Sequence, residues 1–188
     1  READAALSDD DAPALHLFQA LCKGRKMDQI IRQATEIGTA SIIPVHSRFT
    51  VSSPSDSQSK ARNRSARWKT IVKEAMQQSG SPVFTELADV LKLSEAVNYS
   101  REQGLFGIFF HQDPLEEKSL PRLLEDYRQS ERYQGIALFI GPEGGFSADE
   151  VEEMLQAGMH PVRLKTNILR AETAAVYALA AVQVLLQG

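Results

Sequence analysis

Short apolar runs alternate with segments of helical periodicity along most of this chain, and this alternation limits the possible folds more than any other feature. The predicted strands span residues 15–21, 41–45, 83–87, 107–110, 136–140 and 161–164. The predicted helices span residues 27–37, 60–79, 93–97, 120–127, 147–157 and 170–186. Strands that alternate with helices indicate βαβ crossovers. The sequence therefore predicts an α/β fold, with a mostly parallel sheet covered by helices on both faces.

The composition is that of an ordinary globular domain. Of 188 residues, 43% are hydrophobic and 24% are charged. No apolar run approaches the roughly 18–20 residues of a membrane span. The N-terminus carries acidic residues where a signal peptide would be apolar. The single cysteine, Cys22, rules out an intramolecular disulfide, and at the end of an apolar strand it is expected to be an inert buried thiol. We therefore expect a cytoplasmic protein.

Charge is distributed unevenly along the chain. The net charge of −4 argues against a wholly basic nucleic-acid coat but not against local basic patches. One basic stretch includes Arg25 and a second covers residues 60–73, whereas residues 1–14 are acidic and lack periodicity. A serine-rich loop is predicted at 50–59. The four histidines lie far apart without a cysteine partner, so no metal site is implied.

A glycine-rich turn, Gly141-Pro142-Glu143-Gly144-Gly145, follows the apolar run at 136–140. Ser147 and Glu150 then form a capping box (S-x-x-E), and Val151, Met154 and Leu155 supply the expected buried stripe of the next helix. A strand, a glycine turn and a helix N-terminus together present bare backbone N–H groups to a ligand. The turn lacks the lysine of a phosphate loop, and it suits a flat or uncharged ligand; a tight connection without a ligand is the alternative.

A second unusual segment, residues 164–174, lies one helix and one strand further on. It leaves a predicted strand and enters a helix whose first turn is predicted to hold Arg170, Glu172 and Thr173. An arginine there opposes the helix dipole, which suggests a functional role, whereas Glu172 is favoured by the dipole and can be a simple cap.

Together these segments resemble the SPOUT superfamily of knotted methyltransferases, and within it the ribosomal RNA small subunit methyltransferase E family, which methylates N3 of a uridine in 16S rRNA. The resemblance is carried by G-P-E-G-G-F-S-x-x-E from Gly141 and by I-L-R-A-E-T-A from Ile168. Further stretches agree with it: K-G-R-K-M from Lys23, A-T-E-I-G from Ala34, I-P-V from Ile43, R-W from Arg67 and E-A-M-Q-Q-S-G from Glu74.

The resemblance implies a C-terminal deep trefoil knot and a bent S-adenosylmethionine held between the glycine turn and the loop at 164–170. The cofactor residues it implies are His111, Ile140, Gly141, Pro142, Glu143, Gly144, Gly145, Leu164, Asn167, Ile168, Leu169 and Thr173. His111 is equally compatible with a packed or solvated role.

The resemblance also implies the chemistry. Uridine N3 carries a proton near neutral pH, so the site must favour the uridine anion; Arg170 is the candidate for stabilising it electrostatically. Glu172 is the first candidate for taking the proton and Glu143 the second, although both can instead be caps or dimer contacts.

RNA phosphates are expected to contact Arg25, Arg48, Arg62, Arg64 and Arg67, for which a solvated helix face is the alternative. Trp68 is expected in the core. By the resemblance, the enzyme is a homodimer that acts on 16S rRNA or the small ribosomal subunit. Residues 1–14 are then a linker from an N-terminal PUA-like domain outside this chain, and residues 15–188 are the methyltransferase domain.

Two kinds of alternative function remain open on the sequence. One is another knotted methyltransferase, acting on a ribose 2′-OH or on tRNA. The other is a knotted RNA-binding or regulatory module without catalysis, against which the intact glycine turn and the Arg170-x-Glu172-Thr173 segment speak.

Overall fold

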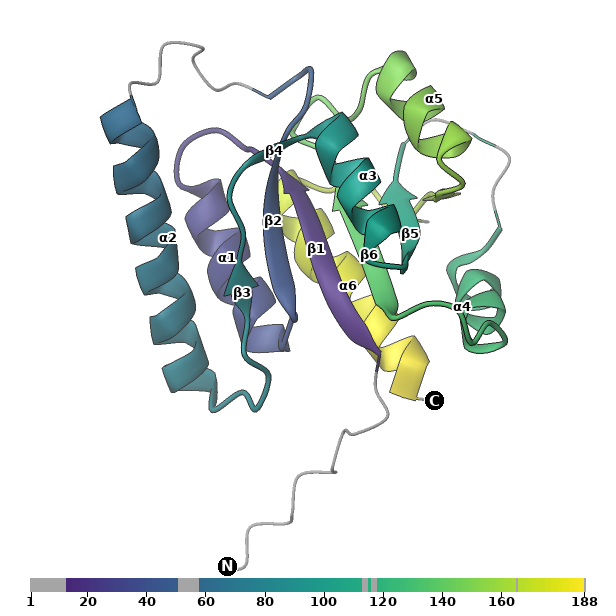
Figure 1. Ribbon diagram of the computed structural model, residues 1–188, viewed down its shortest axis with the longest axis horizontal. Coiled ribbons are helices and arrows are strands. Elements are labelled where there is room, and N and C mark those ends of the chain that lie inside the picture. Colours follow the sequence, from purple (N-terminus) through teal and green to yellow (C-terminus); the bar gives the residue numbers. More distant parts are fainter. Residues whose placement is uncertain (1–12, 51–57, 113–114, 116–117, 165, 188) are drawn as a thin grey trace, which may run out of the picture.

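The computed structural model describes residues 13–50, 58–112, 115, 118–164 and 166–187. Its centre is a seven-stranded sheet in the order β3-β2-β1-β6-β5-β7, with β4 also pairing with β2 (Figure 1). All of these pairings are parallel. The strands are β1 (Ala14–Ala20), β2 (Ser41–His46), β3 (Glu86–Leu87), β4 (Leu91–Lys92), β5 (Leu105–Phe110), β6 (Gly135–Ile140) and β7 (His160–Val162).

Helices cover both faces of this sheet, as the sequence predicts (Figure 1). The helices are α1 (Lys26–Ile37), α2 (Gln58–Ser79), α3 (Leu93–Glu102), α4 (Leu120–Arg128), α5 (Ala148–Gln156) and α6 (Ala171–Gln187). Side chains of α1, α2, α4 and α6 belong to one buried apolar cluster, and those of α3 and α5 belong to a second cluster on the opposite face.

The central strand β6 shows how the sequence produces this arrangement. All six of its residues are buried, because a parallel strand with helices on both faces has no solvated side. Ile136, Leu138 and Ile140 belong to the cluster under α1 and α6, whereas Ala137 and Phe139 belong to the cluster under α3 and α5. Since burying a leucine, isoleucine or phenylalanine side chain contributes about 1.5–3 kcal/mol, the run at 136–140 fixes β6 in the middle of the sheet.

Several predicted helix boundaries are confirmed. Gly38 ends α1 in the left-handed conformation that favours glycine, with φ 88°. Ser119 occupies the N-cap position of α4 without a side-chain capping bond, and Pro121 lies in the first turn. Ser147 caps α5 with the predicted capping box. Trp68 is buried in the core, as expected.

Other predicted boundaries are wrong. The helix predicted at 93–97 begins at Leu93 as expected but continues to Glu102; at its start the Lys92 backbone N–H donates to the Glu95 carboxylate at 2.8 Å. Leu155, predicted in the buried stripe of α5, is exposed, since α5 presents Val151 and Met154 to the core. The strand predicted at 161–164 stops at Val162, whose pairing with Phe110 is the last in that ladder.

The start of α6 also differs from the prediction. The helix begins at Ala171, so Arg170 lies just before it, where its carbonyl accepts from the Ala174 N–H at 2.8 Å. The linker at 1–14 and the loop at 50–59 fall mostly outside the described residues.

Because the strands are parallel, their carboxyl ends meet at one edge of the sheet. Ala20, His46, Phe110, Ile140 and Val162 all end strands there. This edge brings segments that are far apart in the sequence into one place. The trefoil knot stays a prediction, since strand order alone does not define how the chain threads.

Candidate cofactor site

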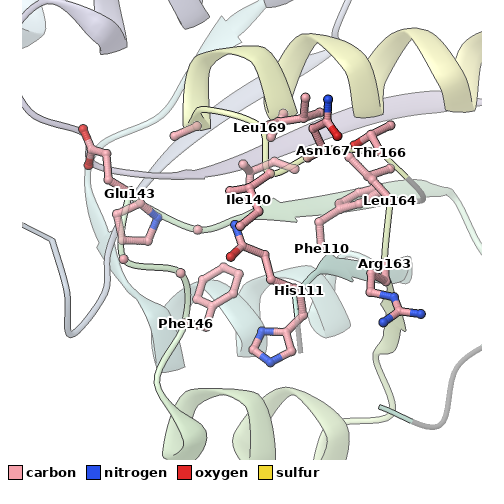
Figure 2. A pocket seen from close by; sticks show the side chains of 18 residues that line it. Phe110, His111, Ile140, Glu143, Phe146, Arg163, Leu164, Thr166, Asn167 and Leu169 are labelled. Carbon is pink, nitrogen blue, oxygen red and sulfur yellow. Dashed lines mark hydrogen bonds between the residues drawn. The ribbon is translucent and has the colours of Figure 1, made fainter. Parts of the chain in front are cut away.

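A cavity of about 230 Å³ lies at the carboxyl edge of the sheet, where the chain leaves β5, β6 and β7 and enters α6 (Figure 2). The glycine turn forms one wall and the segment between β7 and α6 forms another. The lining residues are Phe110, His111, Gln112, Ile140, Gly141, Pro142, Glu143, Gly144, Gly145, Phe146, Arg163, Leu164, Thr166, Asn167, Ile168, Leu169, Ala171 and Ala174.

The glycine turn has a defined geometry that requires its glycines. The Gly145 N–H donates to the Pro142 carbonyl at 2.9 Å, which closes a tight turn. Gly145 has φ +69°, a conformation that L side chains rarely adopt. A Cβ on Gly141 would lie 3.1 Å from the backbone of Gly145, so only glycine fits there without displacing the turn. The turn therefore presents backbone rather than side chains to the cavity.

The capping box of α5 holds a neighbouring segment as well as its own helix. The Glu150 carboxylate accepts from the Ser147 backbone N–H at 2.8 Å and, through its other oxygen, from the Arg48 backbone N–H at 2.7 Å. Glu150 is buried, so both bonds are shielded from water. The exit of β2 is in this way fixed beside the turn that follows β6.

Lys26, at the start of α1, lies between two carboxylates. Its Nζ donates to Glu143 Oε1 in the glycine turn at 2.7 Å and lies 3.8 Å from Glu172 Oε2 in α6. The Lys23 backbone N–H also donates to Glu143, at 3.2 Å. Lys26 thus bridges α1, the glycine turn and α6, and we call this set of residues the Lys26 clasp.

The electrostatics of the clasp act on Glu143 and on Lys26. Partial burial raises the pKa of Glu143, but hydrogen bonds from Lys26 and from backbone N–H groups outweigh it and hold the pKa below its ordinary value. The hydrogen bond to Glu143 raises the pKa of Lys26 in turn. In Figure 2 the Glu143 carboxylate points outward, away from Leu164 and Asn167. Glu143 is therefore poorly suited to accept a proton from a substrate in the cavity.

Glu172 is different. Its Oε2 atom is buried and accepts no hydrogen bond within the structure as described, although Lys26 lies nearby. A buried carboxylate oxygen that accepts no hydrogen bond is uncommon in folded proteins. Glu172 Oε2 is therefore able to accept a further hydrogen bond.

The second wall of the cavity is mainly apolar, with Leu164 and Leu169 facing Ile140 across it (Figure 2). Ile168 in the same wall is 83% exposed. An exposed isoleucine beside an apolar cavity is available to cover an apolar ligand.

The structure brings together nearly all of the predicted cofactor residues. His111, Ile140, residues 141–145, Leu164 and residues 167–169 line the one cavity. Thr173 does not; it is exposed on α6. Arg170 is exposed next to the cavity but does not line it, and Glu172 contacts Lys26 rather than the cavity walls.

Sequence reasoning missed several lining residues, among them Phe110, Phe146, Arg163 and Thr166. Each lies next to a predicted residue in the sequence, so extending every strand exit by one residue on either side would have found them. Arg163 is the most informative of these, because it adds a cation to a largely neutral site.

The predicted RNA-contacting arginines fall into two groups. Arg25 and Arg48 are exposed at the carboxyl edge, although the Arg48 side chain also pairs with Asp149 at 3.4 Å. The other three are on α2. Of these, Arg67 bonds Asp28 of α1 at 2.9 Å and so helps to hold α2 on α1. Arg64 lies over the ring of Trp68 on its own helix at 5.5 Å, and Arg62 is exposed.

Cys22 fits its predicted inert role. It is half-buried, and burial together with the charge of Glu143 raises the pKa of its thiol to about 12. Within the described ranges no group of His, Cys, Asp and Glu side chains could hold a metal ion. In the same part of the chain, no helix is both long and apolar enough to cross a membrane.

Comparison with known proteins identifies the family. The model of the RNA methyltransferase domain family matches residues 10–183. The chain belongs to this family. The mostly parallel α/β fold described above is thus that of a SPOUT-like methyltransferase domain.

Relatives within this family carry informative names. The chain is 32% identical over 161 residues to the ribosomal RNA small subunit methyltransferase E of Aquifex aeolicus, covering 85% of this chain and 64% of that protein. It is 32% identical over 169 residues to the protein of the same name from Synechocystis, covering 90% of this chain and 52% of that protein. The chain therefore spans about half to two thirds of the length of these curated relatives.

Solved structures show the same domain. The putative methyltransferase from Legionella pneumophila, in complex with S-adenosylmethionine, matches with a TM-score of 0.78 at 29% identity, covering 92% of this chain and 66% of that one. The ribosomal RNA small subunit methyltransferase E from Neisseria gonorrhoeae, bound to S-adenosylmethionine, matches with a TM-score of 0.77 at 29% identity, covering 96% and 70%.

Proposed function

We propose that this chain is the catalytic domain of an S-adenosylmethionine-dependent RNA methyltransferase that methylates N3 of a uridine in 16S rRNA of the small ribosomal subunit. The observation that carries the proposal is the cavity formed by the glycine turn and the segment before α6. The names of the similar proteins support the reaction, and the S-adenosylmethionine in two similar structures supports the cofactor.

The residues around the cavity fit S-adenosylmethionine. Apolar side chains of Ile140, Leu164 and Leu169 suit the faces of an adenine, and the backbone of residues 141–145 suits its polar edge. The cavity of about 230 Å³ lies below the ~300–1,000 Å³ common for ligand sites. Part of the cofactor would therefore lie against the exposed segment that carries Asn167 and Ile168, with His111 at the border.

When bound, S-adenosylmethionine supplies a methyl group on a sulfonium, which is a good leaving group. The protein must then make uridine N3 nucleophilic by removing its proton. We assign Arg170, exposed directly before α6, to stabilising the negative charge on the base oxygens. We assign Glu172 to accepting the proton, since the lowered pKa of Glu143 makes that carboxylate a weaker base and its side chain faces outward.

RNA would approach the carboxyl edge of the sheet. Arg25 and Arg48 are exposed there and Arg62 is exposed on α2, so these are our leading candidates for phosphate contacts. Arg64 and Arg67 would contribute charge to the same face, and Arg67 also ties α2 to Asp28 of α1.

We also propose that the domain acts as a homodimer. Tyr177 and Val184 are exposed, two turns apart on α6, and Ile168 is exposed just before that helix. Apolar side chains spaced in this way form a continuous stripe on one helix face. A second copy packed on this stripe would lie next to Arg170 and Thr173.

Two further proposals concern the protein as a whole. We propose that residues 1–14 link this domain to an N-terminal PUA-like domain that grips RNA, and the greater length of the similar proteins supports this. We also propose that the protein works in the cytoplasm, because its proposed substrate is the small ribosomal subunit.

The test is a methyl-transfer assay followed by nucleoside analysis. The chain is incubated with S-adenosylmethionine and small subunits or 16S rRNA that lack the modification, and the digested RNA is analysed by mass spectrometry. The proposal predicts 3-methyluridine, which Arg170→Ala reduces strongly. A 2′-O-methylated nucleoside, or methylation only of tRNA, would favour the other knotted methyltransferases. No cofactor binding together with RNA binding would favour the non-catalytic module.

A further inference from the structure

Phe49 is an aromatic residue beside the cavity whose position core packing does not explain. It follows β2 and is 47% exposed. A Cβ placed on Gly144 would come within 3.1 Å of the Phe49 Cβ and 3.4 Å of its ring. Since Gly144 lines the cavity and Phe49 does not, the ring lies against the outer side of the glycine turn.

The segment that carries Phe49 is held rigidly. The Thr50 N–H donates to the Ser47 carbonyl at 3.1 Å, and the Ser47 N–H donates to the Thr50 hydroxyl at 2.9 Å. Ser47 is buried, and the Arg48 N–H is bound by the buried Glu150. Phe49 is therefore fixed at the tip of a closed turn and cannot fold into the core without breaking these bonds.

Charged residues flank both Phe49 and the turn that it contacts. Arg48, next to Phe49 in the sequence, and Glu143, next to Gly144, are both exposed. A ring in this setting is not part of a broad apolar patch of the kind that binds another protein. An aromatic face next to an arginine on a rigid turn is, however, the arrangement that holds an unstacked base and its phosphate.

We propose that Phe49 stacks on an unpaired base of the substrate RNA, while Arg48 contacts a phosphate next to that base. This inference rests on the proposed function and adds to it a means of holding single-stranded RNA against the cofactor turn. Stacking on a base is tolerant of sequence, so Phe49 would position the strand rather than select the target nucleotide.

The test compares Phe49→Ala and Phe49→Trp with Phe84→Ala. Phe84 is a suitable control because its side chain is 77% exposed, just before β3 at the other end of the sheet. Binding is measured by fluorescence anisotropy with a single-stranded, uridine-containing RNA of about ten nucleotides and with an abasic RNA of the same length. Each variant is also titrated with S-adenosylmethionine.

Phe49→Ala is expected to weaken binding of the base-bearing RNA by about 10-fold and to leave binding of the abasic RNA unchanged. Phe49→Trp should restore binding, and Phe84→Ala should match the wild type. Arg48→Ala should instead weaken binding of both RNAs and lower the slope of log affinity against log salt by about 1.

The proposal is overturned if Phe49→Ala binds the base-bearing RNA like the wild type, or if its affinity for the abasic RNA falls by the same factor. It is also overturned if Phe49→Ala changes the oligomeric state instead of RNA binding, or if the wild type binds neither RNA. The S-adenosylmethionine titration keeps the two proposals apart. If the wild type binds S-adenosylmethionine and Phe49→Ala binds RNA normally, only the stacking role of Phe49 is refuted. If RNA binding depends on Phe49 but the chain does not bind S-adenosylmethionine, only the methyltransferase proposal is refuted.

Discussion

Gly145 is the residue of the glycine turn whose backbone conformation opposes substitution. Its φ of +69° is unfavourable for any L side chain, by about 1–2 kcal/mol, although a Cβ there would meet no neighbour within 4 Å. Gly145→Ala should therefore lower the free energy of unfolding by that amount and weaken S-adenosylmethionine binding up to about 10-fold as the turn relaxes. Urea unfolding and calorimetric titration measure the two effects.

Gly158 provides the control for this prediction. It has φ +79° and also has open space around the position of a Cβ, but it lies after α5, outside the residues that line the cavity. Gly158→Ala should lower stability similarly and leave cofactor affinity unchanged. Equal affinities in the two variants would show that the turn does not hold the cofactor.

Two histidines predict how stability depends on pH. Burial lowers the pKa of His16 and of His160, and Lys118 contributes at His160. The unfolded chain therefore binds more protons than the folded chain just below pH 6.5. The stability contributed by these residues is complete above pH 6.5 and is lost as the pH falls through that value.

The free energy of unfolding should accordingly drop between pH 8 and pH 5.5. His160→Gln and His16→Gln should each reduce this drop. Urea unfolding at the two pH values measures it. A drop that stays the same in both variants would mean that other groups cause it.

At the level of single residues, the sequence predicted where the glycine turn lies better than it predicted which side chains contact one another. The glycines at 141, 144 and 145 were predictable because a strand exit followed by a capping box requires a turn between them. The contact of Lys26 with both Glu143 and Glu172 was not predictable. It joins residues more than a hundred positions apart, and only the packing of α1 against α6 brings them together.

The capping box of α5 does more than end a helix, and its removal should have a larger effect than an ordinary cap. Glu150→Ala removes the buried carboxylate that accepts from the backbone N–H groups of Ser147 and Arg48. We expect a loss of about 2 kcal/mol in the free energy of unfolding. Glu95→Ala removes the exposed cap of α3 and should lower stability by about 1 kcal/mol or less. Equal losses on urea unfolding would argue against the second role of Glu150.

The Lys26 clasp joins three elements, so its loss should affect the site more than the fold. Lys26→Met is expected to weaken S-adenosylmethionine binding, because Glu143 and the turn that carries it lose their tie to α1. Lys26→Arg should retain most of the affinity. Lys118→Met, which removes a similar exposed ion pair with Asp126, should leave cofactor binding unchanged. Calorimetric titration of the three variants distinguishes these outcomes.

Among the elements, long periodic helices were predicted well and short strands poorly. The helix α1 was predictable because its apolar residues recur at helical spacing and Gly38 ends it. The strand β4 was not predictable, because two residues, Leu91 and Lys92, carry no periodicity. β7 was predicted too long, since nothing in the sequence marks the point where Val162 loses its partner strand.

At the level of the whole molecule, the alternation of strands and helices was enough to predict the parallel sheet. Assembly into oligomers depends on which side chains are exposed, and the alternation of strands and helices does not predict that. We expect the chain to sediment as a dimer and Val184→Glu to make it a monomer, because Val184 is 65% exposed on the apolar stripe of α6. Val90→Glu, at another exposed valine, is the control. A wild-type monomer, or a dimer that tolerates Val184→Glu, would contradict this assembly.

The central claim is that the cavity between residues 141–145 and the segment before α6 binds S-adenosylmethionine. Calorimetric titration of the wild-type chain, Gly145→Ala and Gly158→Ala with S-adenosylmethionine tests it most directly. The account predicts saturable binding at one site per chain, weaker in Gly145→Ala and unchanged in Gly158→Ala. No binding by the folded wild-type chain, or equal binding by all three, would contradict it.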